Sequence, residues 1–468
     1  MSSANSLDEA FARGDDSFGS YFRCPPGLVS VEAPTGDVSR NSGYFQFHGV
    51  TCFGRLAHAG SSASPGAGLV DAALHVTRTG DRGVRLPFDL DELSFNLRFE
   101  RYSHGVGSEE VRSHLDILSR LYYAVRPALP VGIRKHLQRL RLAGWEQIQF
   151  PSWPVDVSLD ALMAQVMGEV LRAGGSDPIP FIWFWPDGAP GCSVVTHDVE
   201  DSSGRDFVQQ LMDVDEQAGI ESSFQLVPEG RGNALQSLAG VIRKRGFELN
   251  IHDLNHDGRL FAERGEFLKR ASRINGYVKA FGCDGFRSGA MYRNQRWFSA
   301  FDFAYDMSVP NVAHLEPQRG GCCTVLPYFI GRIVELPLTT IQDYSLFHIL
   351  GDYSIALWKC QIEAILERNG LISVIAHPDY LRDGRAMRVY QELLAYLGTL
   401  RVRRRIWIAL PGEVNQWWRQ RQKMVLVRHG NGWRVEGPGS QRARVAYAVL
   451  DRGAVSYRVE SVDEGNLQ

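Results

Sequence analysis

Apolar and polar positions follow two alternating patterns over the middle of the chain, from about residue 191 to residue 413. Short apolar runs, typical of buried strands, are each followed by a stretch in which apolar residues recur with helical spacing. The predicted strands lie at 193–196, 222–226, 247–251, 285–287, 304–308, 333–338, 371–376 and 406–410, and the predicted helices at 205–218, 234–245, 261–281, 295–301, 354–368 and 387–398. Repeated strand–helix units imply parallel strands, and about seven or eight of them are the size of a barrel. We therefore expect an α/β fold, a distorted (β/α)7–8 barrel.

The regions on either side of this barrel have other patterns. The sequence before it mixes strand-like runs, among them the alternating run 93–99, with helical spacing, which is typical of an α+β region. The sequence after it holds short apolar runs separated by turns such as Asn431-Gly432, which predicts a small antiparallel β add-on. Strands are expected at 44–50, 72–76 and 93–99, and helices at 109–125, 131–142 and 159–173. The expected division is an irregular lead-in at 1–42, an N-terminal α+β region at 43–185, the barrel at 186–422 and the β add-on at 423–468.

Composition narrows the class of protein. The chain has 468 residues, of which 44% are hydrophobic and 22% charged, with a formal net charge of −2. This balance gives no reason to expect a nucleic-acid partner, and no stretch approaches the roughly 18–20 apolar residues of a membrane span. Residues 1–22 are polar and lack the apolar core of a secretion signal, so a cytoplasmic location is expected. The seven cysteines have no regular spacing, which favours free thiols, and nothing in the sequence indicates the oligomeric state.

Candidate metal ligands follow two of the predicted strands. The apolar run at 193–196 leads into Asp198, Glu200 and Asp201, so a buried strand delivers carboxylates to one edge of the sheet. His252 and His256 are four residues apart, a spacing that places two imidazoles on one side of a helical turn. One carboxylate and two histidines with an open fourth position are typical of catalytic zinc. Either Glu200 or Asp201 could supply the carboxylate.

Further polar residues lie at the ends of other predicted strands. Arg287, Asp306 and His377 all fall where a strand of the barrel ends, although they are far apart in the sequence. In a parallel barrel the chemistry gathers at this edge, so their shared placement predicts one site. His314 and the pair Gln342-Asp343 lie in loops expected on the same face, where they could contact substrate or simply be polar loop residues.

The order of these motifs resembles a known family. An acidic cluster at 198–201 is followed by His-x-x-x-His at 252–256, Gly-Phe-Arg-Ser-Gly at 285–289, Tyr-Asp-Met-Ser at 305–308 and Ala-His-Pro at 376–378. Over residues 191–412 this order is similar to that of the NodB-homology polysaccharide deacetylases, carbohydrate esterase family 4. The resemblance implies the fold of that family and a metal-dependent hydrolysis of acyl groups.

The resemblance also implies a set of metal ligands. His252 and His256 match the two histidine ligands of the family. Its second aspartate, a ligand, has no counterpart because Val199 stands in its place, and Glu200 is the nearest substitute, with Asp201 as the rival. The expected ion is Zn²⁺, or another divalent metal such as Co²⁺ or Ni²⁺.

The catalytic roles carry over in the same way. Asp198 matches the catalytic base, Arg287 the arginine that orients this base, and His377 the general acid. Asp306 is a loose match to the acid that tunes the histidine. The expected function is hydrolysis of an N-acyl amide, N-acetyl first of all, on an amino sugar or glycan intermediate. Two alternatives stay open: a hydrolase of a non-sugar cyclic or linear amide that need not hold a metal, and a catalytically silent binding module, which the valine at 199 keeps open.

Overall fold

The computed structural model describes residues 16–57, 60–104, 142–229 and 235–460 of the chain. Contacts divide the chain into two compact units. Unit 1 comprises Met1–Tyr102, Val157–Ala189 and Trp417–Gln468, and unit 2 comprises Ser103–Asp156 and Pro190–Gln416. The predicted helices at 109–125 and 131–142 lie outside the described residues, apart from Leu142.

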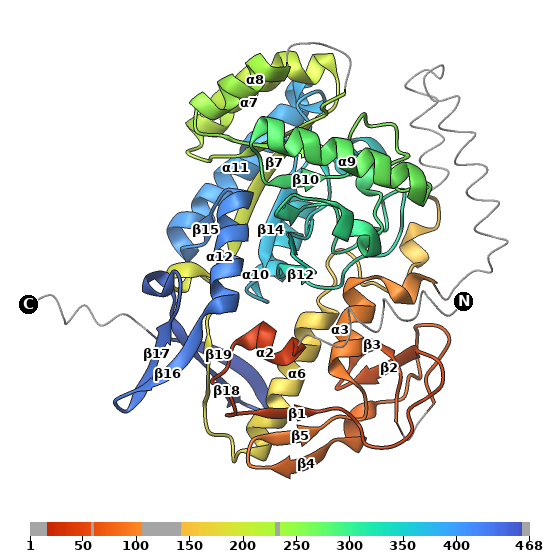
Figure 1. Ribbon diagram of the computed structural model, residues 1–468, viewed down its shortest axis with the longest axis vertical. Helices are drawn as coiled ribbons and strands as arrows, with labels where there is room; N and C mark the ends of the chain where they lie inside the picture. The colour runs from red at the N-terminus through yellow and green to blue at the C-terminus, as the bar shows by residue number, and fades with distance from the viewer. Residues whose placement is uncertain (1–15, 58–59, 105–141, 230–234, 461–468) are drawn as a thin grey trace, which may run out of the picture. The chain divides into compact units, whose positions relative to one another are not determined.

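Unit 2 contains one curled, half-barrel sheet with helices around it, which confirms the predicted mixed α/β architecture (Figure 1). Its strand order is β12-β13-β11-β10-β9-β8-β7-β14, with β15 paired to β7 beside this path. All neighbouring pairs are parallel except β12 with β13. The strands are β7 (Cys192–Val199), β8 (Ser223–Leu226), β9 (Glu248–His252), β10 (Gly285–Arg287), β11 (Tyr305–Asp306), β12 (Tyr328–Ile330), β13 (Ile333–Glu335), β14 (Leu371–Ile375) and β15 (Trp407–Ile408).

Side-chain hydroxyl groups complete the contact between the two ends of this parallel sheet. Among the described residues no strand ladder joins β13 to β14. Instead, the chain that continues from β13 donates from Thr339 Oγ1 to Leu371 O at 2.6 Å and from Thr340 Oγ1 to Ser373 O at 2.7 Å. Threonine hydroxyl groups therefore link the chain after β13 to β14, where the described residues form no strand ladder.

The helices of unit 2 alternate with its strands, as the apolar spacing predicted. All eight residues of β7 are buried, which fits the apolar run near its start, and the strand also buries Thr196, His197 and Asp198. Helix α7 starts after the capping residue Asp201, and α9 starts after Glu263, whose carboxylate accepts two backbone N–H groups. The helices are α7 (Ser202–Gln217), α8 (Leu235–Lys244), α9 (Arg264–Phe281), α10 (Ala356–Leu366) and α11 (Gly384–Arg404), with shorter turns η6 (Gly289–Met291), η7 (Gln295–Ala300), η8 (Ser345–Leu350) and η9 (Tyr380–Arg382). Helix α12 (Pro411–Lys423) contains the boundary between the units.

Unit 1 joins the N-terminal region to the tail. Strand β6 pairs with β18, and β18 pairs with β19, so the tail expected as a separate add-on shares a sheet with residues from before the barrel. The predicted hairpin around Asn431-Gly432 is present as β16 and β17. The elements are α2 (Ser17–Phe22), β1 (Ser30–Glu32), β2 (Gly43–Phe47), β3 (Val50–Gly54), η1 (Ala72–His75), β4 (Thr77–Gly80), β5 (Gly83–Arg85), α3 (Leu90–Arg98), η2 (Arg101–His104), α6 (Ser158–Ala173), β6 (Ile179–Ile182), η5 (Pro186–Gly188), β16 (Val425–His429), β17 (Gly432–Glu436), η10 (Ser440–Arg442), β18 (Val445–Asp451) and β19 (Ala454–Val459), while η4 (Trp145–Gln147) belongs to unit 2.

An aromatic cluster forms part of the core of unit 1. The rings of Phe22, Phe181, Phe184 and Tyr457 lie with centroids 5.2 to 6.3 Å apart. The buried guanidinium of Arg421 donates to four backbone carbonyl groups around this cluster. A buried charge is thus surrounded by acceptors rather than by a carboxylate.

Two strand predictions in unit 1 were wrong, and the described part of the predicted lead-in, residues 16–42, contains regular elements. The run 93–99 belongs to helix α3, which Asp89 caps, and the run 72–76 forms η1, which Asp71 caps. In each case a capping aspartate starts a helical turn that the apolar alternation does not reveal. Within the predicted irregular lead-in, α2 and β1 are regular elements.

Candidate metal centre and active site

The end of β7 separates three acidic residues into different positions. Asp198 is buried within the strand, and Glu200 follows directly after it. Asp201 is the N-cap of α7, where its Oδ1 accepts the Gly204 N–H at 2.8 Å. Asp201 is therefore engaged by the helix, and Glu200 is the carboxylate that turns toward the histidines.

His252 is oriented by the neighbouring strand. It is the last residue of β9 and is paired in register with Arg287 of β10. Its Nδ1 donates to the carbonyl oxygen of Arg287 at 3.0 Å. A neutral imidazole that donates from Nδ1 presents the lone pair of Nε2, which here faces Glu200.

His256 lies in an irregular loop rather than on the helical turn that the four-residue spacing suggested. The loop has left-handed backbone conformations at Asp253 (φ 53°) and His256 (φ 55°), and no helix is assigned there. Gly289 lets this loop approach closely, because a Cβ at that position would lie 2.5 Å from Asp253 Oδ2 and 2.9 Å from His256 Cδ2. The two histidines still converge, with ring centroids 4.9 Å apart.

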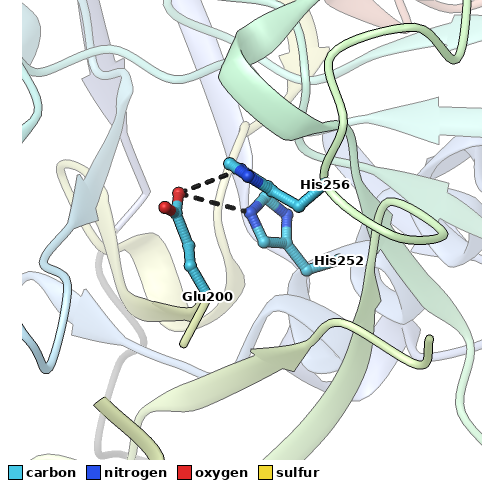
Figure 2. Close-up of side chains that lie close together, drawn as sticks. All are labelled: Glu200, His252 and His256. Atoms are coloured by element: carbon cyan, nitrogen blue, oxygen red, sulfur yellow. Dashed lines mark ion pairs between the residues drawn. The ribbon is translucent and has the colours of Figure 1, made fainter. Parts of the chain in front are cut away.

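Glu200, His252 and His256 offer three ligand atoms that lie within 4.8 Å of one another. Figure 2 shows the Glu200 carboxylate pointing at both imidazoles, with Oε1 3.0 Å from His256 Nε2 and 3.8 Å from His252 Nε2. Burial disfavours the charged carboxylate, but His256 and His252 outweigh burial and hold the pKa of Glu200 well below its usual value.

These residues fit a divalent metal ion. The Nε2 atom of His252 is buried and makes no hydrogen bond within the described part of the chain. Such an atom is costly unless it has a partner that the protein alone does not supply. One carboxylate oxygen with two imidazole nitrogens is a donor set that suits Zn²⁺, and it leaves a coordination position for water or substrate.

Arg287 pairs with the predicted base. Its Nη1 donates to Asp198 Oδ1 at 2.8 Å and to Thr196 Oγ1 at 2.9 Å, and its Nε donates to Met307 O at 3.0 Å. Burial opposes ionisation of Asp198, but the charge and hydrogen bond of Arg287, together with the charge of His377, outweigh it and lower the pKa of the carboxyl. Asp198 Oδ2 lies 3.8 Å from His252 Nε2, beside the candidate metal site. The predicted neighbourhood of Asp198 and Arg287 is thus present.

The carboxylate that contacts His377 is Asp343, not Asp306 as the motif order suggested. Asp343 Oδ1 lies 2.6 Å from His377 Nδ1, and Asp343 Oδ2 accepts the His377 backbone N–H at 2.7 Å. His377 Nε2 lies 3.6 Å from Glu200 Oε1. Burial disfavours the imidazolium, but the charge and hydrogen bond of Asp343, followed by Glu200, raise the pKa of His377 well above its ordinary value.

Asp306 has a different partner. Its carboxylate accepts hydrogen bonds from the Ser308 hydroxyl group at 2.8 Å and from the Ser308 backbone N–H at 3.0 Å. It also shares a hydrogen bond with Glu335. Both carboxyls are fully buried, and burial, with the neighbouring negative charge, raises the pKa of Glu335 well above its usual value. A hydrogen bond between two carboxyls needs a proton on one of them, and the raised pKa favours Glu335 as its carrier. Pairing of β11 with β13 sets this contact, because Asp306 and Glu335 are directly opposite in register.

The two other loop residues singled out in the sequence have structural contacts. His314 is buried, its Nε2 donates to Pro151 O at 2.9 Å, and its ring stacks on Trp153. Gln342 makes a hydrogen bond to Glu316, and burial raises the pKa of Glu316 to about 7. Neither residue belongs to the group of candidate metal ligands.

Of the three comparisons with known proteins, only the one with solved structures gave matches. No protein-family model matches the sequence, and no curated protein does. Solved structures do match. They include a polysaccharide deacetylase from Mycobacterium smegmatis at 18% identity, covering 51% of this chain and 93% of that one with a TM-score of 0.42. A polysaccharide deacetylase from Pseudomonas aeruginosa PAO1 matches at 14% identity, covering 53% and 96% with a TM-score of 0.41. Puue allantoinase matches at 11% identity, covering 57% and 97% with a TM-score of 0.41.

The two deacetylases carry the name of the family that the sequence motifs resemble. At these identities and TM-scores the roles of individual residues have to be inferred from the side chains of this chain. No helix in the described part of the chain is both long and apolar enough to cross a membrane.

Proposed function

We propose that this protein is a metal-dependent deacetylase that hydrolyses an N-acyl amide, N-acetyl first of all, on an amino sugar or glycan. One arrangement supports this proposal above all others. The candidate ligands Glu200, His252 and His256 have two neighbours: Asp198, with a lowered pKa, 3.8 Å from His252, and His377, with a raised pKa, 3.6 Å from Glu200. A base and an acid beside a Lewis-acid site are what hydrolysis of a stable amide requires.

Glu200 and the two histidines would hold the ion. A divalent metal bound there supplies a Lewis acid, which polarises an acyl carbonyl and makes a nearby water more acidic. The protein prepares this site by fixing the His252 tautomer through the carbonyl of Arg287. Asp201 takes no part, because it caps α7.

Asp198 is the proposed general base. Its Oδ1 is occupied by Arg287 at 2.8 Å, which leaves Oδ2, on the side of His252, to accept a proton from the attacking water. Arg287 both keeps the carboxylate charged and fixes its direction, since its own Nε and Nη1 are tied to Met307 O and Thr196 Oγ1. A well-placed base typically contributes about 10²–10⁴-fold to the rate.

His377 is the proposed general acid. Its Nδ1 is engaged by Asp343, so Nε2 is the atom that can give a proton to the amide nitrogen as the C–N bond breaks. An amine anion is a very poor leaving group, and a proton donor on this side of the bond removes that barrier. The buried Asp343 stabilises the charged imidazolium that the step consumes.

The proposed reaction and the proposed substrate class rest on different observations. The geometry supports amide hydrolysis, whereas the amino sugar follows from the motif resemblance. A metal-independent amide hydrolase would leave the convergence of Glu200, His252 and His256 without a purpose. A silent binding module would not need the paired contacts of Asp198 with Arg287 and of His377 with Asp343.

The test is acetate release from N-acetylglucosamine oligosaccharides by the zinc-loaded protein, before and after removal of the metal by a chelator. The proposal expects turnover that stops on chelation and returns with Zn²⁺. In the same assay Asp198→Asn, which removes the proposed base, should lose activity, and the matched control Asp302→Asn, the same chemical change at an exposed site, should keep full activity. Acetate release that persists without metal would contradict metal dependence. If the protein releases acetate from no acetylated amino sugar but hydrolyses a cyclic amide such as allantoin, the amino-sugar substrate is wrong and a non-sugar amide takes its place.

A further inference from the structure

A buried histidine beside the proposed base has no part in the chemistry described so far. His197 lies in β7 between Thr196 and Asp198 and is 0% exposed. Its Nδ1 donates to the carbonyl oxygen of Ala376 at 2.9 Å, and its Nε2 lies 2.9 Å from Asp215 Oδ2. His197, the residue before the base Asp198, is thus bonded to Ala376, the residue before the acid His377.

The position of this ring at the end of a strand ladder gives it a mechanical role. Backbone pairing between β7 and β14 runs from Cys192 opposite Leu371 to Thr196 opposite Ile375. The Ala376 N–H then donates to Thr196 O at 3.0 Å. The next bond between the two segments is the one from His197 Nδ1 to Ala376 O. Directly beyond it β7 continues through the base Asp198 to Val199, whereas the other segment leaves β14 and enters the loop that carries the acid His377.

The Nε2 side of the His197 ring also faces a hydrogen-bonded group, the carboxylate of Asp215. The Asp215 carboxylate on α7 also accepts hydrogen bonds from Ser222 Oγ and from the Tyr390 hydroxyl of α11, each at 2.6 Å. Asp215 and Tyr390 are both fully buried. A buried network in which each member is engaged holds the imidazole in one orientation. His197 is therefore a rigid spacer anchored to two helices.

We infer that His197 is a positioning residue that holds the general acid His377 in line with the base Asp198 through the carbonyl of Ala376. The kinetic part of this inference rests on the proposed function. A displacement of about 1 Å in a reacting group can cost roughly 10²-fold in rate. An apolar side chain could fill the space of the ring but could not bond Ala376 O, and the acid loop would lose that tether.

Two substitutions of His197 distinguish the role of Nδ1 from the role of Nε2. In His197→Asn the amide nitrogen can take the place of Nδ1 and keep the bond to Ala376 O. In His197→Gln the longer side chain can reach Asp215 in the manner of Nε2 but leaves Ala376 O without its donor. Each variant is compared with the wild type for zinc content, for amide hydrolysis and for hydrolysis of an aryl acetate. The aryl acetate has a leaving group that departs without a proton, so it needs the base but not the acid.

The expected result is selective. In His197→Gln, kcat for the acetamide falls by about 10–100-fold, whereas KM, zinc content and aryl acetate turnover stay within about twofold of the wild type. His197→Asn retains most of the amide activity. Wild-type amide turnover in His197→Gln, or equal losses in the Asn and Gln variants, would overturn the inference, as would parallel losses on amide and ester.

Two further measurements keep the inference testable. If the His197 variants do not fold, Asp215→Asn loosens the same ring from its other side; a selective fall in amide kcat supports the role, and an unchanged amide-to-ester ratio overturns it. If the wild type hydrolyses neither substrate, the proposed function fails, and crystals of zinc-loaded His197→Gln decide the positioning role alone. The distance from His377 Nε2 to Glu200 Oε1, 3.6 Å here, should change in His197→Gln. An unmoved His377 would overturn the inference.

Discussion

Asp343 holds His377 by two atoms at once: its Oδ1 lies 2.6 Å from the ring Nδ1, and its Oδ2 accepts the backbone N–H of the same histidine at 2.7 Å. One buried carboxylate thus contacts both the ring and the backbone of His377. Because this contact uses Nδ1, the remaining nitrogen is directed toward Glu200 and the candidate metal site. The pairing is the basis for assigning His377 as a proton donor.

Asp343→Asn should weaken that donor. An amide in place of the carboxylate removes the charge that, against burial, raises the pKa of His377. The protonated ring is the active form, so activity is lost as pH rises through this pKa, and the alkaline limb of the kcat profile should move to lower pH. We expect kcat for an acetamide to fall about 10²-fold, with a smaller effect on an aryl acetate. A pH–rate profile with an unmoved alkaline limb would contradict the assignment.

Asp198→Asn should separate catalysis from metal binding. The asparagine keeps an oxygen for Arg287 Nη1 but can no longer take a proton, so kcat should fall by about 10²–10⁴-fold. Zinc content should be unchanged, because Asp198 is outside the group of three candidate ligands. The measurement is metal analysis of the same sample used for kinetics. Loss of zinc together with activity would make Asp198 a ligand instead of the base.

Glu200→Ala and Asp201→Ala form a matched pair, since one acid faces the histidines and its neighbour caps a helix. Glu200→Ala should lose zinc affinity and keep thermal stability in the metal-free state. Asp201→Ala should keep zinc and lose about 1 kcal/mol of stability through the missing cap. Equilibrium dialysis and thermal unfolding measure the two effects. The opposite outcome, zinc lost with Asp201, would restore Asp201 as the ligand.

Glu335→Gln should change how stability depends on pH. The folded state raises the pKa of Glu335, so it keeps a proton that the unfolded chain releases once pH exceeds about 4.5. Wild-type stability should therefore decline as pH rises above this value, by up to about 1.4 kcal/mol per pH unit while one proton is retained. Glutamine can donate to Asp306 and accept the Val309 N–H at all pH values.

The readout is the difference in Tm between Glu335→Gln and the wild type at pH 5 and at pH 8. The variant should gain on the wild type at the higher pH. The exposed substitution Glu367→Gln serves as the control and should show no such trend. A constant difference in Tm across this range would show that the Asp306–Glu335 pair holds no extra proton.

The strands of unit 2 could be predicted because buried apolar residues gather in short runs bounded by polar or turn residues, as in β14. The alternation at 93–99 misled for a physical reason. In α3 the polar residues Ser94 and Asn96 are themselves buried, and they bond to Leu90 O and Phe53 O. Alternation of side-chain polarity therefore did not mark a solvent-facing side there.

The convergence of the candidate ligands with the proposed base and the proposed acid could also be expected, because each lies at or shortly after the end of a strand. The partner of His377 could not. Asp343 lies 34 residues before it, in a loop with no motif, and Asp306, which has the motif, is directed to Glu335 by the register of β11 and β13. Likewise, nothing in the sequence distinguishes His197 from an ordinary core residue, because its role comes from a contact with a backbone carbonyl.

The central claim is that Glu200, His252 and His256 hold one divalent ion. The most direct measurement is a crystal structure of the zinc-replete protein with anomalous data collected at the zinc edge, compared with the double variant His252→Ala/His256→Ala. The account predicts one anomalous peak within bonding distance, about 2.0–2.2 Å, of the Glu200 carboxylate and both Nε2 atoms. It predicts no peak there in the double variant. An empty site in the zinc-replete wild type, or an ion bound by other residues, would contradict it.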